Sequence, residues 1–269
     1  MSAPSVTPIS AGALPHLHVE QDGPILIVHL DRAAKRNAVN DALLASLARL
    51  FDAPPKDAKV IVLAGRGDHF CAGLDLAEHE QRDAFGVMQH SQGWHKVFER
   101  IQFGTLPVVS ALHGGVIGGG LELAAATHVR VADSTAFFAL PEGQRGIFVG
   151  GGATVRVGRI IGAGRLVEMM LTGRTYKAEE GLQLGLAHYV VEPGQALAKA
   201  MELAGKIAGN APLSNYAILN AIPRIDDMSM KDGLFTESLM TALTQTSDEA
   251  SQRLRAFLER RQPRVSAGE

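Results

Sequence analysis

The chain has 269 residues, of which 46% are hydrophobic and 20% charged, so it can bury a sizeable core. Its formal net charge is −2, which provides no global field that would attract nucleic acid or an anionic membrane surface, and we expect neither as a partner. The single cysteine, Cys71, excludes an intramolecular disulfide, and no stretch approaches the roughly 20 apolar residues that cross a bilayer.

The first fourteen residues are rich in serine, proline and small residues and show no periodic pattern. They have neither the basic start nor the continuous apolar run of a secretory signal, so we expect a cytoplasmic protein. We predict that residues 1–14 form a mobile tail that takes no part in the chemistry.

Five short apolar runs bounded by turn residues predict strands. They are residues 25–30, 60–64, 108–112, 129–132 and 136–140. Two helical patterns, with apolar residues on one face, lie between some of these runs, at residues 40–51 and 88–101. The alternation of strand and helix predicts βαβ units with parallel strand pairing.

From about Gly162 onward the strand signals fade and helical patterns dominate. These patterns cover residues 164–171, 178–184, 196–207, 213–221 and 234–243. Before the last helix, Thr246 and Glu249 have the spacing of a capping box. We therefore predict that the C-terminal third is an α-helical appendage.

Two glycine-rich segments each follow a predicted strand and open a helix. Residues 67–76 read GDHFCAGLDL, and residues 113–123 read HGGVIGGGLEL. Glycine permits close approach, and the first turn of a helix leaves N–H groups unpaired, so each turn can donate to an anionic oxygen. A dinucleotide-binding turn has the same order of elements, but its GxGxxG spacing does not fit residues 114–120. That the glycines only permit tight packing stays open as an alternative.

The ordered set of motifs resembles the enoyl-CoA hydratase/isomerase (crotonase) superfamily over residues 17–264. The motifs are KRNAVN from Lys35, FCAGLDL from Phe70, HGGVIGGGLELA from His113, Pro141-Glu142 with GIFVGGGAT, and AFLERRQP from Ala256. The resemblance implies an α/β fold, a crotonase-like spiral of ββα repeats, with a core over residues 15–209. It also implies a C-terminal α-helical trimerisation segment over residues 210–269, and hence a homotrimer or a dimer of trimers.

The resemblance also implies the catalytic groups. In this family the carbonyl of an acyl-CoA thioester lies between two backbone N–H groups, an oxyanion hole, which would belong here to Leu74 and Gly119. Glu122 and Glu142 match the two carboxylates of the hydratases, with Glu122 mainly activating water and Glu142 mainly donating a proton. Acidic residues are also ordinary at the start of a helix, where the helix dipole favours them, so a structural role stays open for both.

Contacts with the rest of the substrate are implied in the same way. Arg36, Ala38 and Ala72 would lie at the coenzyme A moiety, while Trp94 and Phe98 fall in the region that covers the acyl chain. Both aromatic residues could equally belong to the core. We expect no metal and no redox cofactor, because coenzyme A is part of the substrate and no HExxH pattern is present.

The sequence therefore favours an enoyl-CoA hydratase, a hydro-lyase that adds water to a 2-enoyl-CoA. Double-bond isomerisation, hydrolysis of an acyl-CoA, and a non-catalytic acyl-CoA carrier or RNA-binding homologue remain alternatives. Two departures from the family pattern bear on this choice: Leu140 stands where familiar short-chain hydratases carry glutamine, and Val149 where many members have proline. Less polar surroundings would raise the pKa of a carboxyl group, which helps an acid and hinders a base.

Overall fold

The computed structural model describes residues 7–8, 14–77 and 81–259. The chain divides into two compact units, Met1–Ala208 and Gly209–Glu269. Most of the tail predicted over residues 1–14 lies outside the described residues. Within it, the two-residue strand Thr7–Pro8 (β1) pairs antiparallel with Leu17–Asp22 (β2).

The first unit contains a seven-stranded sheet in the order β1-β2-β3-β4-β5-β7-β10. Pairing is antiparallel from β1 to β3 and parallel from β3 to β10, so the predicted parallel pairing is confirmed. The parallel strands are Ile25–Leu30 (β3), Val60–Gly65 (β4), Val108–Leu112 (β5), Val129–Asp133 (β7) and Tyr189–Val191 (β10). The near-continuous apolar sequences of β3, β4 and β5 fit strands buried on both faces, whereas β10, at the edge of the sheet, is only partly buried.

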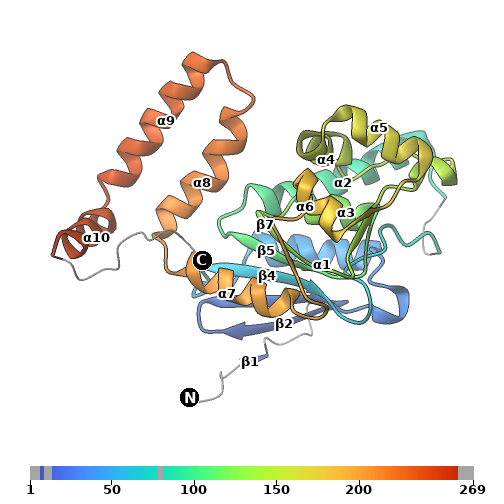
Figure 1. The fold of residues 1–269 in the computed structure, drawn as a ribbon, viewed down its shortest axis with the longest axis horizontal. Coiled ribbons are helices and arrows are strands. Elements are labelled where there is room, and N and C mark those ends of the chain that lie inside the picture. Colours follow the sequence, from blue (N-terminus) through green and yellow to red (C-terminus); the bar gives the residue numbers. More distant parts are fainter. Residues whose placement is uncertain (1–6, 9–13, 78–80, 260–269) are drawn as a thin grey trace. The chain divides into compact units, whose positions relative to one another are not determined.

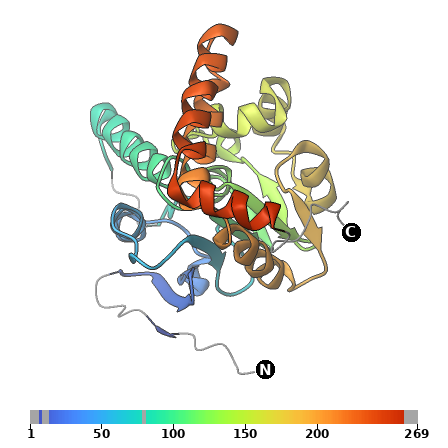
Figure 2. The same ribbon diagram turned by 90° about the vertical axis from the view of Figure 1, so that its left-hand side faces the viewer.

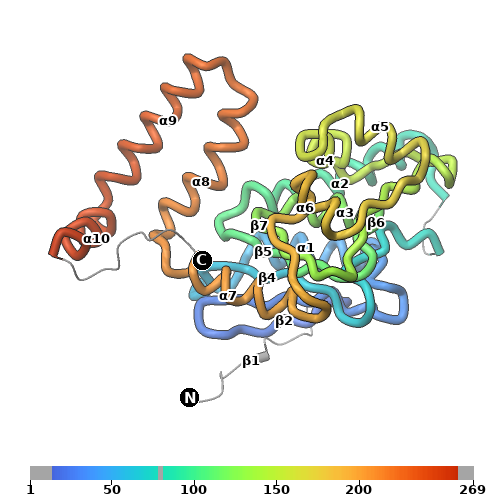
Figure 3. The backbone as a smooth tube through the Cα atoms, in the orientation of Figure 1, coloured from blue at the N-terminus to red at the C-terminus, as the bar shows by residue number. Residues whose placement is uncertain are grey.

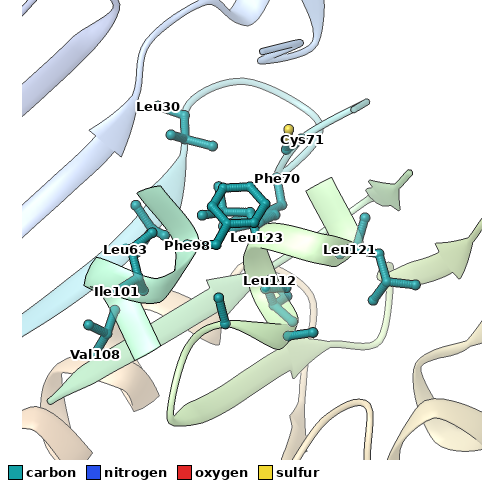
Figure 4. Close-up of a cluster of buried hydrophobic side chains, with 14 of the residues drawn as sticks. Leu30, Leu63, Phe70, Cys71, Phe98, Ile101, Val108, Leu112, Leu121 and Leu123 are labelled. Carbon is teal, nitrogen blue, oxygen red and sulfur yellow. The ribbon is translucent and has the colours of Figure 1, made fainter. Parts of the chain in front are cut away.

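Different helices cover the two faces of this sheet (Figure 1). Ala196–Ala208 (α7) packs on β3, β4, β5 and β7, where its alanines meet Val60 and Val62. Ile61 and Leu63 alternate to the other face, where they join the larger cluster that includes residues of Asp41–Asp52 (α1). Figure 4 shows the part of this cluster around Leu63. Figure 2 shows the long helix Ala84–Gln102 (α2, teal-green) at the edge of this unit.

A second, three-stranded sheet in the order β6-β8-β9 lies within the same unit. Its strands are Gly115–Ile117 (β6), Phe137–Ala139 (β8) and Tyr176–Lys177 (β9). The chain passes from β6 directly into a seven-residue helix, Gly119–Ala125 (α3), as the tube in Figure 3 shows. After β8 come a short 3-10 helix and three α-helices, Glu142–Arg145 (η3), Ala153–Ile161 (α4), Ala163–Thr172 (α5) and Ala178–Leu184 (α6).

Gly209–Glu269 forms the second unit, which is helical where it is described. Its helices are Pro212–Ile225 (α8), Met230–Gln245 (α9) and Asp248–Leu258 (α10), of which α8 and α9 contact each other side by side (Figure 1). The capping box predicted at Thr246 and Glu249 is wrong by one residue. Thr246 is still helical (φ −85°, ψ 0°), whereas Ser247 is extended and its hydroxyl accepts the N–H of Ala250. No helix among the described residues is long and apolar enough to cross a membrane.

The prediction that the C-terminal third is a separate helical appendage is also wrong in part. The helices α6 and α7 belong to the first unit, and β9 and β10 were missed because they have only two and three residues. The first unit also contains the unpredicted strand β2, whose sequence LHVEQD is too polar to stand out.

Candidate active site

The two glycine-rich segments of the sequence lie side by side. The N–H of Phe70 donates to the carbonyl of His113 at 2.8 Å, and Cys71 N–H donates to Gly115 O at 3.1 Å. Ile117 N–H then donates to Cys71 O at 3.0 Å, which completes a short parallel bridge. Residues 43 or more positions apart in sequence are thus held in a fixed register by backbone hydrogen bonds.

Glycine is required at two points where these segments meet. Gly73 has φ +90°, and Gly118 has φ +54° and ψ −124°, both in regions that residues with a Cβ rarely adopt. A Cβ on Gly73 would lie 2.8 Å from the carbonyl oxygen of Ile117 and 3.1 Å from the nitrogen of Gly119. The close approach of the first turn to the start of α3 therefore depends on the missing side chain.

Two backbone N–H groups have no described hydrogen-bond acceptor where the turns meet. Around Leu74, the carbonyl of Gly73 accepts from Val39 N–H at 2.7 Å, and Asp75 N–H donates to Val39 O at 2.9 Å. In the described part of the chain, neither Leu74 N–H nor Gly119 N–H donates to a protein acceptor. Since Gly119 is the first residue of α3, its N–H is one of those that a helix cannot satisfy internally.

Both residues line a cavity of about 150 Å³. The predicted catalytic residues Glu122 and Glu142 line it too, as does Trp94. The remaining lining residues come from α2 and from the loop before α4, namely Val87, His90, Ser91, Ile147, Phe148, Val149, Gly150 and Gly151. The structure therefore brings five of the predicted site residues into one cavity.

Glu122 is almost fully buried and is held by the loop before α4. Its Oε1 accepts hydrogen bonds from Gly151 N–H at 2.8 Å and from Ala153 N–H at 2.9 Å. Burial raises the pKa of Glu122, while the N–H donors and the charge of Arg156 oppose that rise. One carboxylate oxygen is thus fixed in place, and the other can act on a ligand.

Glu142 begins η3, directly after Pro141, and its side chain is buried. Its Oε2 is buried and has no hydrogen-bond partner among the described residues. Burial, with a smaller contribution from the charge of Glu122, raises the pKa of Glu142 to about 7. The two residues that depart from the family pattern are placed differently: Leu140 is fully buried, and Val149 lines the cavity, where it adds apolar surface.

The residues predicted to contact coenzyme A do not line the cavity. Arg36 is exposed and left-handed (φ +51°), and its carbonyl accepts from Ala72 N–H at 2.9 Å. The carbonyl of Ala38 accepts from the Arg32 side chain. Arg36, Ala38 and Ala72 thus surround the first glycine turn, but no described contact ties them to the cavity.

Phe98 and Cys71 belong to the core. Phe98 is fully buried behind Trp94, with the two rings edge to face at a centroid distance of 5.5 Å, and it does not line the cavity. Figure 4 shows Phe98 and Cys71 among the core side chains. Burial raises the pKa of the Cys71 thiol to about 12, and the thiol donates to Asn37 O, so it is a packed group and not a nucleophile.

The side of the cavity formed by α2 was largely missed. His90 and Ser91 lie four and three positions before Trp94, so helical spacing alone could have placed all three on one face. His90 Nε2 lies 3.0 Å from Asp41 Oδ1 and 3.4 Å from Trp94 Nε1. No sequence signal identified the Gly151 and Ala153 N–H groups as donors to Glu122, because they depend on how a distant loop folds back.

The chain is similar in sequence to known proteins of one enzyme family. The model of the family described as "Enoyl-CoA hydratase/isomerase" matches residues 20–267. An enoyl-CoA hydratase of Mycobacterium tuberculosis is 33% identical, and the match covers 93% of this chain and 96% of that protein. A 2,3-dehydroadipyl-CoA hydratase of Escherichia coli is 32% identical, with 92% and 97% covered.

Solved structures give the same result. A protein from Rhodopseudomonas palustris that is assigned as an enoyl-CoA hydratase has a TM-score of 0.89 at 50% identity, over 91% of this chain and 95% of that one. An enoyl-CoA hydratase from Bacillus anthracis has a TM-score of 0.87 at 30% identity, over 93% and 98%. The α/β fold expected from the sequence is confirmed by these likenesses.

Proposed function

Because the chain belongs to the enoyl-CoA hydratase/isomerase (crotonase) family, we propose that it is a hydratase that adds water across the 2,3 double bond of a 2-enoyl-CoA thioester. The family model and the hydratase names of the relatives support this class of reaction. The observation that supports it most is the cavity in which two unpaired backbone N–H groups lie with two buried carboxyl groups.

The two N–H groups form the proposed oxyanion hole. Leu74 N–H and Gly119 N–H donate to the thioester oxygen, which becomes negatively charged when water adds at C3 and an enolate forms. Donors fixed in advance at such an oxygen stabilise the transition state by about 3 kcal/mol each in other enzymes. Because both donors belong to the backbone, their position depends on the glycine turns and not on a side chain.

The two carboxyl groups share the proton transfers. Glu122 takes a proton from water as the oxygen bonds to C3, and Glu142 gives a proton to C2 as the enolate collapses. Passage of one proton from Glu122 to Glu142, directly or through solvent, restores both groups. The raised pKa of Glu142, about 7, supports its role as the acid, because much of it is protonated at neutral pH.

The rest of the substrate follows from the same proposal. Coenzyme A is held near Arg36, Ala38 and Ala72, and the acyl chain extends past Trp94. The chemistry assigned to Glu122 and Glu142 uses no metal and no redox cofactor. The protein acts as a homotrimer or a dimer of trimers, with Gly209–Glu269 as the assembling unit.

The test is to identify the product from 2-butenoyl-CoA in heavy-oxygen water. The proposal predicts 3-hydroxybutanoyl-CoA with one heavy oxygen at C3, measured by mass spectrometry and NMR. An alkene shifted to the 3,4 position would indicate an isomerase. Free coenzyme A would indicate a hydrolase, and binding without any turnover on a panel of 2-enoyl-CoAs would indicate a carrier.

A further inference from the structure

One side chain links the two glycine-rich segments through an unusual contact. Nδ1 of His69 lies 2.8 Å from the nitrogen of Gly115 and accepts its N–H. A ring nitrogen that accepts carries no proton, so His69 is neutral and its proton is on Nε2. We propose that His69 is a positioning residue, which sets how the segment with Leu74 N–H lies against the segment with Gly119 N–H. This rests on the proposed function, in which these two N–H groups hold the thioester oxygen.

Several hydrogen bonds join the two glycine-rich segments. Among those described, this is the only one in which a side chain accepts from a backbone N–H of β6. On one side of it, His113 Nε2 donates to Gly67 O at 2.9 Å, and Phe70 N–H donates to His113 O at 2.8 Å. On the other side, Cys71 N–H donates to Gly115 O. Gly115 is buried, so loss of the imidazole would leave its N–H without an acceptor. A buried N–H without an acceptor destabilises the fold, and a shift of β6 can relieve this by bringing the N–H to another acceptor.

The imidazole itself is held in place. Its ring meets Phe137 of β8 edge to face, with centroids 6.3 Å apart and planes at 86°. The carbonyl of His69 accepts from Asn37 Nδ2 at 2.8 Å, and the same amide nitrogen donates to Arg66 O. Because the ring and the backbone of His69 are both fixed, the hydrogen bond to Nδ1 holds Gly115, and with it the start of β6, at one position.

The path from this contact to the oxyanion donors is short. β6 runs from Gly115 to Ile117, and Gly119 follows two residues later. The two turns touch at Gly73, where a Cβ would lie 3.1 Å from Gly119 N. A displacement of β6 by a fraction of an ångström therefore changes the separation of the two donors, and misplacement by about 1 Å can lower a rate about a hundredfold.

The chain offers a matched control. His128 also accepts a backbone N–H on Nδ1, from Val108 at 2.9 Å. Val108 is the first residue of β5, at the opposite end of that strand from His113 and the second glycine turn. His128→Ala therefore removes the same kind of hydrogen bond, together with the one from Nε2 to Gln102 O at 2.9 Å, and touches neither oxyanion segment.

The test measures two quantities in wild type, His69→Ala, His69→Asn and His128→Ala. One is kcat and KM with 2-butenoyl-CoA. The other is the infrared carbonyl stretch of bound butanoyl-CoA, labelled with ¹³C at the thioester carbon. This saturated ester cannot be hydrated, so its frequency reports only how strongly the carbonyl oxygen is hydrogen-bonded.

We expect His69→Ala to lower kcat about tenfold to a hundredfold with little change in KM, and to lose part of the shift of the bound carbonyl to lower frequency. His69→Asn restores both values, because Oδ1 of asparagine can accept at the position of Nδ1. His128→Ala lowers the melting temperature but changes neither the shift nor kcat.

Two results would overturn the proposal. One is wild-type kcat and carbonyl frequency in His69→Ala, or in His69→Leu if the alanine variant does not fold. The other is an equal loss of kcat and of the carbonyl shift in the His69→Ala and His128→Ala variants, which would mean that His69 contributes only to packing. If the wild-type protein itself leaves the carbonyl frequency of butanoyl-CoA unshifted, the proposed oxyanion hole fails, and the role of His69 fails with it.

Discussion

Glu122 and Glu142 are buried in one cavity, but their surroundings differ in a way that suits different tasks. Two backbone N–H groups bind Oε1 of Glu122 and favour its charged form, whereas Oε2 of Glu142 has no partner in the described structure. The sequence could identify both residues through their motifs. It could not predict this asymmetry, because the donors Gly151 and Ala153 reach Glu122 from about thirty positions further along the chain.

Glu142 should make the stability of the protein depend on pH. Its pKa is about 7 in the folded protein and near 4.5 in the unfolded chain, so ionisation opposes folding. The contribution of the neutral group is fully present below pH 4.5 and is lost as pH rises through 7, by no more than about 3 kcal/mol. The free energy of unfolding of wild type, relative to Glu142→Gln, should therefore fall between pH 4.5 and pH 7. Urea titrations across this range check it, and a difference that does not change with pH would contradict it.

The same group should limit activity at alkaline pH. Hydration needs a protonated Glu142 and an ionised Glu122, so kcat/KM for 2-butenoyl-CoA should fall as pH rises above about 7. An acid limb should reflect Glu122, whose pKa is raised by burial. Because the two groups interact, both limbs belong to the pair. Initial rates between pH 5 and pH 9 test this, and a rate that rises steadily through pH 8 would be incompatible with Glu142 as the acid.

At the scale of elements, the two glycine turns determine where the backbone N–H groups of the site lie. The positions of the turns followed from the sequence, since each joins a strand to a helix or loop through glycine, and their use as donors stays a prediction. The register between them could not be predicted, because it depends on the bridge between Cys71 and Val116, which lie 45 positions apart. The strands β3 and β5 were predicted with their observed bounds because all but one residue of each is apolar.

Substitution of Gly73 should separate the effects of backbone strain and close approach. In Gly73→Ala the new Cβ meets Ile117 O and Gly119 N, so kcat should fall about a hundredfold as the donors move apart. Gly162→Ala is the matched control: φ is +83°, yet no atom lies within 4 Å of the added Cβ. Both variants should lose about 1 to 3 kcal/mol of stability from the positive φ. Equal kcat values in the two variants would show that the contact at Gly73 has no catalytic importance.

At the scale of the whole molecule, the family resemblance put the boundary between core and helical segment at residues 209/210, next to the boundary between the two compact units, whereas the helical patterns alone put it too early. Helix α7 covers the main sheet of the first unit, and its periodic pattern alone gave no sign of that partner. Only Gly209–Glu269 forms a separate unit. Its exposed large apolar side chains include Ile222, Leu234, Phe235 and Leu239, and such exposure is typical of an interface.

These side chains lead to a prediction about assembly. Light scattering should give a mass three or six times the 28.6 kDa of one chain. The double substitution Phe235→Ser and Leu239→Ser should lower that mass, because it removes apolar surface that a partner would cover. A wild-type mass equal to one chain at micromolar concentration would rule out the proposed trimer.

The central proposal, hydration by two carboxyl groups beside a backbone oxyanion hole, is tested most directly by the hydration rate of 2-butenoyl-CoA in Glu122→Gln and Glu142→Gln. The glutamine at position 122 can still accept from Gly151 and Ala153, so that variant removes the charge and keeps the contacts. Glu168→Gln, on an exposed carboxyl group outside the cavity, is the control. We predict losses of at least about a hundredfold in each of the first two variants, since general acid–base groups contribute that much or more, and none in the third. Full hydration by either cavity variant would contradict the mechanism.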